Sequence, residues 1–517
     1  MKKNKIRPNV VVNKCSEVES AAFRGLIEDV NLTCYLAWTD EVGVLEQQYA
    51  FFEETINQAS IIADGLSGKF TEVNFKYLTP ELLSSLSWAE PIALDLMLRL
   101  DSAKQMTRSQ SVRLYHYILA FWCQKIEELK PSIFYSREVP HEVTDFIFYA
   151  LCKHYGVRTI IFFGPVLLGR RVFIEDFKQP WAQTEDYRNF LADNPAIQYE
   201  VDKYIQKIRS DYSKAAPAYF VEGMKVVYGS NRWKQEFLSF YRFVIRRYFK
   251  KIALWGIALL NIFPTLLVPP RMMRNLLLKA KKIVGSQLTQ DEFDTLPKLL
   301  QTLAIDHIPQ NPYIFFCLNY QPELTTSPLG GIFNDQTLAI SMLSANLPVG
   351  WVLVVKEHPG QLIKNDGYNY LGRDIEFYKK LISLGNVEFI SQRIDQFDLI
   401  DASKCVATIT GTAGWEAIIR GKPVVVFGDA WYQSAPNVFR IKTTLDCQQA
   451  LEKILTEEIV GDDNLLMQFI GSMIASGISI DFNKIEARWA NREFNFHESV
   501  NIFKDQFLSY IGQGNFK

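Results

Sequence analysis

Cysteine is scarce in this chain, and the cysteines present form no recognisable motif. The seven cysteines among 517 residues are scattered from Cys15 to Cys447, without a Cys-x-x-Cys pair. An odd number of dispersed thiols argues against a disulfide framework or a zinc site, and favours reduced thiols in a cytosol. Long apolar runs are scarce near the start as well, where the first run after the basic residues is only Val10–Val12, so we do not expect a secreted protein.

Neither sign of charge is in excess over the whole chain, because the formal net charge is −1. This balance argues against a protein that coats nucleic acid, so we expect no nucleic-acid partner. At 517 residues the chain is too long for a single hydrophobic core, and we expect two domains. The hydrophobic content of 48% and charged content of 22% are ordinary for folded domains.

One long stretch lacks acidic residues altogether. No Asp or Glu occurs from Phe237 to Gln290, a window that includes an apolar run at 252–270. That run is short for a spanning helix and contains Asn261 and Pro264, so we predict insertion into one face of a membrane. The basic flanks, within 242–282, would bind anionic lipid, and a buried interdomain helix is the alternative. The window's ten basic residues are Arg242, Arg246, Arg247, Lys250, Lys251, Arg271, Arg274, Lys279, Lys281 and Lys282.

The N-terminal half alternates short apolar, β-branched runs with longer amphipathic stretches. This alternation is typical of a parallel sheet wrapped by helices. We predict strands at Asn9–Val12, Leu32–Trp38, Ser132–Tyr135 and Arg158–Phe163, and helices at Glu46–Ile62, Ser111–Leu129 and Glu142–Tyr155.

The second half shows the same alternation more clearly. Asn334 is expected to cap a helix that ends before Pro348, and Gly421 is expected to end a helix at Ala413–Arg420. We predict strands at Tyr313–Leu318, Trp351–Val355, Val387–Ile390, Cys405–Ile409 and Pro423–Phe427.

These patterns together predict an α/β protein with two Rossmann-like domains that face each other across a cleft. The basic apolar segment would lie between the two domains. We place an N-terminal domain at 1–236, the basic apolar segment at 237–290, a C-terminal domain at 291–445, and helices that partly cross back to the first domain at 446–517.

Two short polar motifs follow predicted strands of the second half. Lys356-Glu357-His358-Pro359 follows Trp351–Val355, and Thr410-Gly411-Thr412 follows Cys405–Ile409. Because open α/β sheets bind ligands at the carboxyl ends of their strands, we expect both motifs at one ligand site. Either motif alone is compatible with an ordinary loop or strand-to-helix turn, and their combination favours a functional site.

The residue types of these motifs suit a nucleotide phosphate. The glycine permits close backbone approach, the two flanking hydroxyls can donate to phosphate oxygens, and the start of a helix favours an anion. The histidine can bind the phosphate, the proline fixes its loop, and the Glu one turn into the helix can accept from a ribose hydroxyl. The predicted nucleotide-binding residues are Lys356, His358, Pro359, Thr410, Gly411, Thr412, Glu416 and, after the preceding strand, Gln321.

Two further residues are candidates for catalysis. Glu323 follows the strand Tyr313–Leu318, where a carboxylate can act as a nucleophile, a base or a stabiliser of positive charge. His141 follows the strand Ser132–Tyr135 and can act as a base from the first domain. A solvated loop Glu and a helix N-terminus are the ordinary alternatives. No Asp-x-Asp, Gly-x-Gly-x-x-Gly or Walker A sequence occurs, so we predict phosphate stabilisation without a metal.

Three segments resemble motifs of bacterial capsule polysaccharide biosynthesis proteins. They are Phe315–Gly331 with Gln-x-Glu-x6-Gly, Val355–Pro359 with Lys-Glu-His-Pro, and Ile409–Gly428 with Thr-Gly-Thr-x-Gly-Trp-Glu-Ala. The resemblance covers about 310–440 and reaches the first half only around Pro140-His141. It implies a GT-B glycosyltransferase fold and, because the family includes Kdo transferases, transfer from a CMP-activated 2-keto sugar acid.

The resemblance also implies roles for individual residues. His358 and Thr410–Thr412 would bind the donor phosphate, and Glu416 would bind its ribose. Glu323 would stand where many retaining members carry an Asp that acts on the anomeric carbon. Asn319 stands where His is common in relatives, which is consistent with a different sugar.

The prediction is therefore a glycosyltransferase that transfers Kdo or a related sugar acid to a lipid-linked glycan of capsule or lipopolysaccharide. It would be peripheral on the inner, cytoplasmic face of the plasma membrane and need no cofactor beyond its nucleotide-sugar donor. Attack by Glu323 would give a retaining route, and a base such as His141 an inverting one. The alternatives are a nucleotide-sugar epimerase of the same shape and a non-catalytic polysaccharide export or assembly factor.

Overall fold

The computed structural model of the chain describes most of both predicted domains. The basic apolar segment 237–290, with its predicted membrane contact, lies outside the described residues. In the part of the chain that is described, no helix is long and apolar enough to cross a membrane. The described residues are 7–38, 49–69, 73–100, 106–164, 170–179, 181, 190–210, 295–362, 372–456, 459, 461–484, 487 and 493–512.

The first sheet is mainly parallel. Its strands are β1 (Asn9–Asn13), β2 (Asn31–Ala37), β3 (Glu54–Asn57), β4 (Ile133–Ser136), β5 (Arg158–Phe163), β6 (Arg170–Ile174) and β13 (Ile478–Ser479). They lie in the order β13-β6-β5-β4-β1-β2-β3, in which β6 pairs antiparallel with both β5 and β13 and the other described pairs are parallel. Val11 faces one core and Val10 and Val12 face the other, because successive side chains of a strand alternate. The four strands predicted for this half are confirmed.

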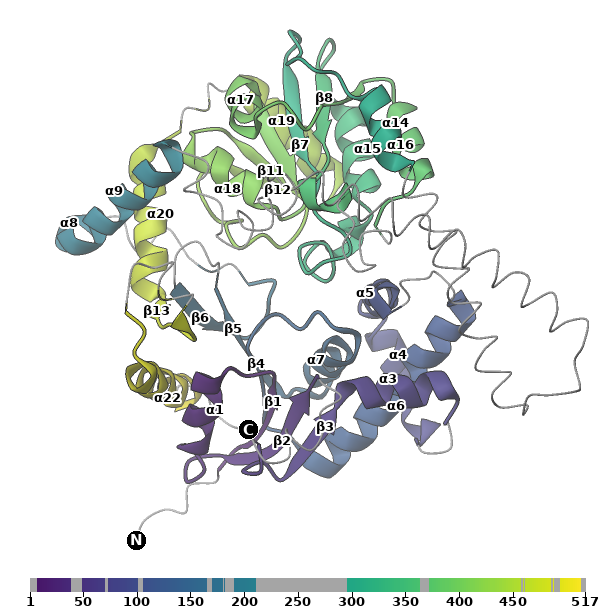
Figure 1. The fold of residues 1–517 in the computed structure, drawn as a ribbon, viewed down its shortest axis with the longest axis vertical. Coiled ribbons are helices and arrows are strands. Elements are labelled where there is room, and N and C mark those ends of the chain that lie inside the picture. Colours follow the sequence, from purple (N-terminus) through teal and green to yellow (C-terminus); the bar gives the residue numbers. More distant parts are fainter. Residues whose placement is uncertain are drawn as a thin grey trace, which may run out of the picture.

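Helices cover both faces of the first sheet (Figure 1). The predicted helices at Ser111–Leu129 and Glu142–Tyr155 are confirmed as α6 and α7, and a capping box of Thr107 and Gln110 starts α6. The helical elements are α1 (Glu17–Arg24), α3 (Gln58–Ser67), η2 (Phe75–Tyr77), α4 (Pro80–Ser85), α5 (Glu90–Leu96), η3 (Met97–Leu100), α6 (Arg108–Leu129), α7 (Val143–Tyr155), α8 (Phe190–Asp193) and α9 (Pro195–Ser210).

The predicted helix at Glu46–Ile62 is wrong between residues 49 and 57. There the chain turns and then forms β3, which pairs in parallel with β2 from Cys34 onward. α3 begins only after Asn57, whose side chain caps it. The short strand is stabilised by pairing with a distant segment, and local periodicity does not contain that information.

The second sheet is entirely parallel. Its strands are β7 (Tyr313–Cys317), β8 (Val352–Lys356), β9 (Val387–Phe389), β10 (Cys405–Thr408), β11 (Val424–Val426) and β12 (Val438–Arg440), in the order β12-β11-β10-β7-β8-β9. Helices cover both faces, so its strands are continuous apolar runs, and the five predicted strands are confirmed. Together with the first sheet, this confirms the predicted α/β fold.

The helices of the second sheet differ from prediction at one cap. Asp335, rather than Asn334, caps α15, because its carboxylate accepts from the N–H of Thr337 at 3.0 Å. Asn334 instead ends the short η6. The helical elements are α14 (Leu296–Leu303), η6 (Gly331–Asn334), α15 (Gln336–Asn346), η7 (Pro359–Leu362), α16 (Ile375–Ile382), α17 (Gln396–Ala402), α18 (Thr412–Ile419) and α19 (Thr444–Thr456).

Two helices connect the domains at the C-terminal end of the chain. α22 (Phe496–Gly512) lies against the first domain, where Phe503 and Phe507 contact Phe23 of α1 with ring centroids 5.5 and 5.4 Å apart (Figure 1). α20 (Asp463–Ser476) packs along α9, and Arg209 Nη2 lies 2.6 Å from an Asp463 oxygen. Segments from each half of the chain therefore pack on the other half.

Candidate functional site

The candidate site lies at the carboxyl edge of the second sheet, around the end of β7. The chain proceeds from β7 outward to β8 and β9, and then returns to the other side of β7 to form β10, β11 and β12. The strand order therefore reverses between β7 and β10. Ligands of open α/β sheets bind at such switch points, and the loops after β7, β8 and β10 contain the predicted motifs.

Asn319, in the loop after β7, ties this loop to the end of β10. Its Oδ1 accepts from Thr408 Oγ1 at 2.8 Å and from the N–H of Ile409 at 3.2 Å. Thr408 Oγ1 in turn accepts from the N–H of Gly411 at 3.2 Å. Because a hydroxyl can donate and accept at once, these groups form one chain of hydrogen bonds. Asn319 thereby shapes the turn that precedes α18.

The two threonines of the turn after β10 have different surroundings. Thr410 is buried, and its Oγ1 donates to the carbonyl of Thr325 at 2.7 Å. Thr412 is exposed and begins α18, whose N-cap is Gly411 and has no capping side chain. Because no side chain of the N-cap accepts from the first N–H groups of the helix, these groups can donate to a bound anion. Thr412 and the start of α18 are thus suited to bind phosphate, whereas Thr410 holds the loop.

His358, in the loop after β8, is an uncharged hydrogen-bond donor at neutral pH. Its Nδ1 accepts from the N–H of Gly360 at 3.1 Å, so the neutral ring carries its proton on Nε2. Burial lowers the pKa of His358 to about 4, although the charge of Glu357 raises it and that of Arg373 lowers it further. The ring centroid lies 5.6 Å from that of Tyr320, which places His358 beside the loop after β7.

Lys356 and Pro359 hold the loops around His358. Lys356 is buried, its Nζ donates to the carbonyl of Ile394 at 2.6 Å, and burial lowers its pKa. Pro359 begins η7, which brings Gln361 to the loop after β7. There the N–H of Gln321 donates to Gln361 Oε1, and Gln361 Nε2 donates to the carbonyl of Gln321, both at 2.8 Å. Gln321 is therefore fixed between the two loops.

A buried ion pair beneath these loops was not predicted. Arg373 Nε lies 2.7 Å from Glu357 Oε2, and the two side chains are 0% and 2% exposed. The hydroxyl of Tyr378 donates to the same Glu357 oxygen at 2.7 Å. Arg373 also donates to the side chain of Gln321 and to the carbonyl of Asn319. The pair therefore joins the loops after β7 and β8. The one available signal was Glu357 itself, an acid directly after a buried strand, which requires a cationic partner.

Glu323 is exposed in the segment between β7 and η6, which also contacts the first domain. Its Oε2 accepts from Thr325 Oγ1 at 3.2 Å. Further along, Ser327 Oγ donates to Asp95 of α5, and Leu329 packs in the core of the first domain. The Thr325 carbonyl also accepts from Thr410, so this segment links Glu323 to the turn before α18.

Glu416 lies on the buried side of α18. It is 8% exposed, and its Oε2 accepts from Gln396 Nε2 at 2.7 Å. Burial raises the pKa of Glu416 to about 7, although Gln396 and the charge of Arg420 act in the opposite direction. Near neutral pH the carboxyl group is therefore partly protonated, and it can donate as well as accept a hydrogen bond.

His141 belongs to the edge of the first sheet. Its Nδ1 donates to the carbonyl of Val139 at 2.8 Å, and its own carbonyl accepts from Arg99 Nη1 at 2.8 Å. Asp145, in the first turn of α7, accepts from the N–H of Glu142 at 2.9 Å and so completes a capping box with Glu142, the N-cap. Within the described residues, no hydrogen bond or ion pair joins His141 to the loops of the second sheet.

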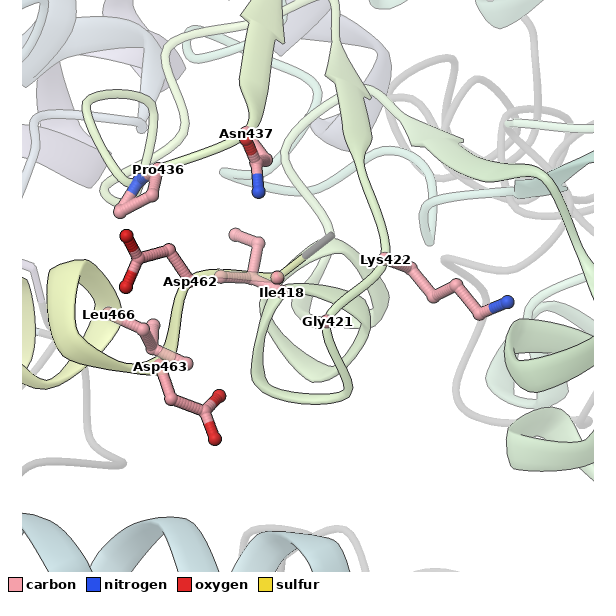
Figure 2. A pocket seen from close by; sticks show the side chains of 9 residues that line it. Ile418, Gly421, Lys422, Pro436, Asn437, Asp462, Asp463 and Leu466 are labelled. Atoms are coloured by element: carbon pink, nitrogen blue, oxygen red, sulfur yellow. The ribbon is translucent and has the colours of Figure 1, made fainter. Parts of the chain in front are cut away.

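A small hollow elsewhere in the second domain is separate from these loops. It lies at the C-terminal end of α18, beside Gly421, Asn437 and Asp462 (Figure 2). Thr412 begins the same helix at its opposite end. Among the described side chains, no group of three or more His, Cys, Asp or Glu residues is placed to hold a metal ion.

Comparison with known families supports the resemblance seen in the motifs. Residues 327–436 match the family model of capsule polysaccharide biosynthesis proteins, which confirms the predicted resemblance over this part of the chain. The matched region includes His358, Thr412 and Glu416, but begins after Glu323. No curated protein matches the sequence.

Solved structures resemble the chain only at low identity. A β-Kdo 2,7 transferase, KpsC of Thermosulfurimonas dismutans, is 16% identical with a TM-score of 0.24, over 43% of this chain and 62% of that one. The chain thus spans less than two thirds of that transferase. A UDP-GlcNAc 2-epimerase of Methanocaldococcus jannaschii is 9% identical with a TM-score of 0.24, over 91% of this chain and 98% of that one. Neither likeness, at such TM-scores, supports a statement about function.

Proposed function

We propose that the chain is a glycosyltransferase of bacterial surface polysaccharide biosynthesis. It transfers Kdo or a related 2-keto sugar acid from a CMP-activated donor to a lipid-linked glycan. The observation that carries the proposal is the placement of a neutral His358 and of the start of α18 on loops beside one switch point. The family match over 327–436 supports the assignment to capsule polysaccharide biosynthesis.

The leaving phosphate is stabilised by groups that are in place before the donor binds. The start of α18 directs N–H groups and the positive end of the helix dipole toward an anion, and Thr412 adds a hydroxyl. His358 Nε2–H donates to a phosphate oxygen, and its orientation is set by Gly360. Such fixed donors stabilise developing charge with little reorganisation, so the proposed transfer needs no metal. Glu416 binds the donor ribose.

Glu323 acts at the anomeric carbon in the retaining route. Its carboxylate oxygen forms a bond to C2 of the sugar as the C2–O bond to the phosphate breaks, and CMP leaves with the electron pair. An acceptor hydroxyl then attacks C2, displaces Glu323 and gives its proton to a base. In the inverting route the acceptor hydroxyl attacks the donor directly, and His141 removes its proton.

The acceptor is proposed to reach the site from the membrane. The residues of 242–282 would hold the protein on anionic lipid at the inner face of the plasma membrane, where lipid-linked glycans are extended. This part of the proposal rests on the sequence of the basic apolar segment.

Calorimetric titration of CMP, UDP and GDP tests the proposed donor. CMP should bind most tightly, and His358→Ala should weaken CMP binding by about tenfold or more, because a hydrogen bond to a charged group is lost. His307→Ala is the matched control, since His307 is exposed in the same domain and should leave binding unchanged. Preferential binding of UDP would contradict the donor assignment and favour the epimerase alternative.

A further inference from the structure

Arg99, in η3 of the first domain, has one guanidinium edge without a partner in the described structure. Its Nη1 donates to the carbonyl of His141 at 2.8 Å. Nε and Nη2 are both buried, and neither has a hydrogen-bond partner among the described residues. In Arg373 the same two atoms, Nε and Nη2, contact the two carboxylate oxygens of Glu357. Arg99 therefore has the same donor edge, but no carboxylate of the described residues accepts from it.

The position of Arg99 places this edge where the two domains meet. Asp95, one helical turn earlier in α5, accepts from Ser327 in the segment that follows β7. Figure 1 shows α5 on the side of the first domain nearest the second sheet. Arg99 itself donates to the carbonyl of His141, the proposed base, and follows Asp95, which contacts the segment that contains Glu323.

The chemistry of the edge defines the class of its ligand. Two parallel N–H donors on a planar cation match the two oxygens of a carboxylate or a phosphate. Burying such donors without an acceptor is unfavourable, and a bound anion would remove that cost. Burial raises the pKa of Asp95 and the charge of Arg99 lowers it, but neither Nε nor Nη2 of Arg99 donates a hydrogen bond to Asp95 or to another described acid. The side chain as a whole is only partly buried, so the edge lies close beneath the surface.

We propose that the Nε–Nη2 edge of Arg99 binds an anionic group of the substrate in bidentate geometry. The inference rests on the proposed function and deepens it. The anion is either the carboxylate of the donor sugar acid or a phosphate of the lipid-linked acceptor. In the first case Arg99 selects sugar acids over neutral sugars, because a neutral sugar leaves the guanidinium without an acceptor.

Ligand-induced thermal shifts of the full-length chain distinguish the two sources. The probes are free Kdo, its methyl ester, which lacks the charge, and inorganic phosphate. The variants are Arg99→Gln, Arg99→Lys, which keeps the charge without the fork, and Arg113→Gln, an exposed arginine of α6 as the control. Arg99-dependent binding of Kdo but not of its ester identifies the donor carboxylate, and Arg99-dependent binding of phosphate alone identifies the acceptor.

In either case Arg99→Gln should weaken binding of the anion about tenfold or more, Arg99→Lys should weaken it less, and Arg113→Gln should not change it. Equal binding of every probe by wild type and both Arg99 variants overturns the inference. Titration of CMP separates this outcome from failure of the proposed function. CMP should bind wild type and Arg99→Gln alike, because it binds at α18, and a wild type that does not bind CMP contradicts the proposed function alone.

Discussion

The buried ion pair between Arg373 and Glu357 gives the sharpest prediction about the loops of the candidate site. Glu357→Gln removes the negative charge but keeps the shape, and leaves the Arg373 cation at 0% exposure without a counter-ion. Loss of one partner of a buried pair costs about 3–5 kcal/mol. Because Glu357 Oε1 also accepts from the N–H of His358 at 2.7 Å, the loop after β8 should loosen as well.

Hydrogen exchange followed by mass spectrometry is the appropriate assay, because a chain with two domains does not unfold as one unit. Amide protection in peptides covering β7 and β8 should fall by about two to four orders of magnitude, which corresponds to the loss of the pair. CMP binding should weaken in parallel.

Two controls make this result decisive. Glu376→Gln removes one partner of the ion pair with Lys379, whose side chains are 79% and 62% exposed, and should change stability by less than about 0.5 kcal/mol. Adding Arg373→Met to Glu357→Gln removes the uncompensated charge and should restore part of the protection. Protection within about threefold of wild type in Glu357→Gln would refute the assigned role of the pair.

Other predictions concern the pH dependence of stability, the turn before α18 and the predicted membrane contact. The pKa of Glu416 is raised from 4.5 to about 7, so its contribution to stability is fully present below pH 4.5 and is lost as the pH rises through 7. The free energy of unfolding of Glu416→Gln should not show this pH dependence between pH 4.5 and 7. At pH 8 the variant should be more stable than wild type by up to about 3 kcal/mol, measured by denaturant unfolding. Thr412→Ala should weaken CMP binding about fivefold by calorimetry with little change in stability, whereas Thr410→Ala should lower stability by about 1 kcal/mol through the lost bond to Thr325. Deleting 252–270 should abolish sedimentation with anionic liposomes, and unchanged sedimentation would contradict the membrane contact.

The positions of most strands could be predicted because both sheets are largely parallel. A strand covered by helices on both faces is a continuous apolar run, as in Val10–Val12 and Ile314–Phe316. β3 could not be predicted in this way, because it is short, lies at the edge of the sheet and is set by its register with β2. The observed N-cap of α15 lies one residue after the predicted one. Asn and Asp are both favourable N-cap residues, so the sequence does not distinguish Asn334 from Asp335, and only the backbone geometry selects the aspartate.

The loops of the candidate site could be predicted from their motifs, but the tasks of individual side chains could not. Lys356 and Thr410 have the residue types that bind phosphate, yet their polar atoms contact the carbonyls of Ile394 and Thr325. The sequence around Arg373 gives no indication of its role, because its partner Glu357 lies in a different segment of the chain. Motif spacing identifies which loops meet at a sheet edge, whereas side-chain direction depends on contacts between distant segments.

Transfer of the sugar itself is the measurement that tests the central claim most directly. The full-length chain would be incubated with CMP-Kdo labelled in the sugar and a lipid extract from a capsulated bacterium, and CMP release and labelled lipid would be followed together. The account predicts one CMP released for each Kdo that enters a lipid-linked glycan, with both lost in His358→Ala and retained in His307→Ala. CMP-Kdo left intact by a wild-type protein that instead interconverts UDP-sugars would contradict it.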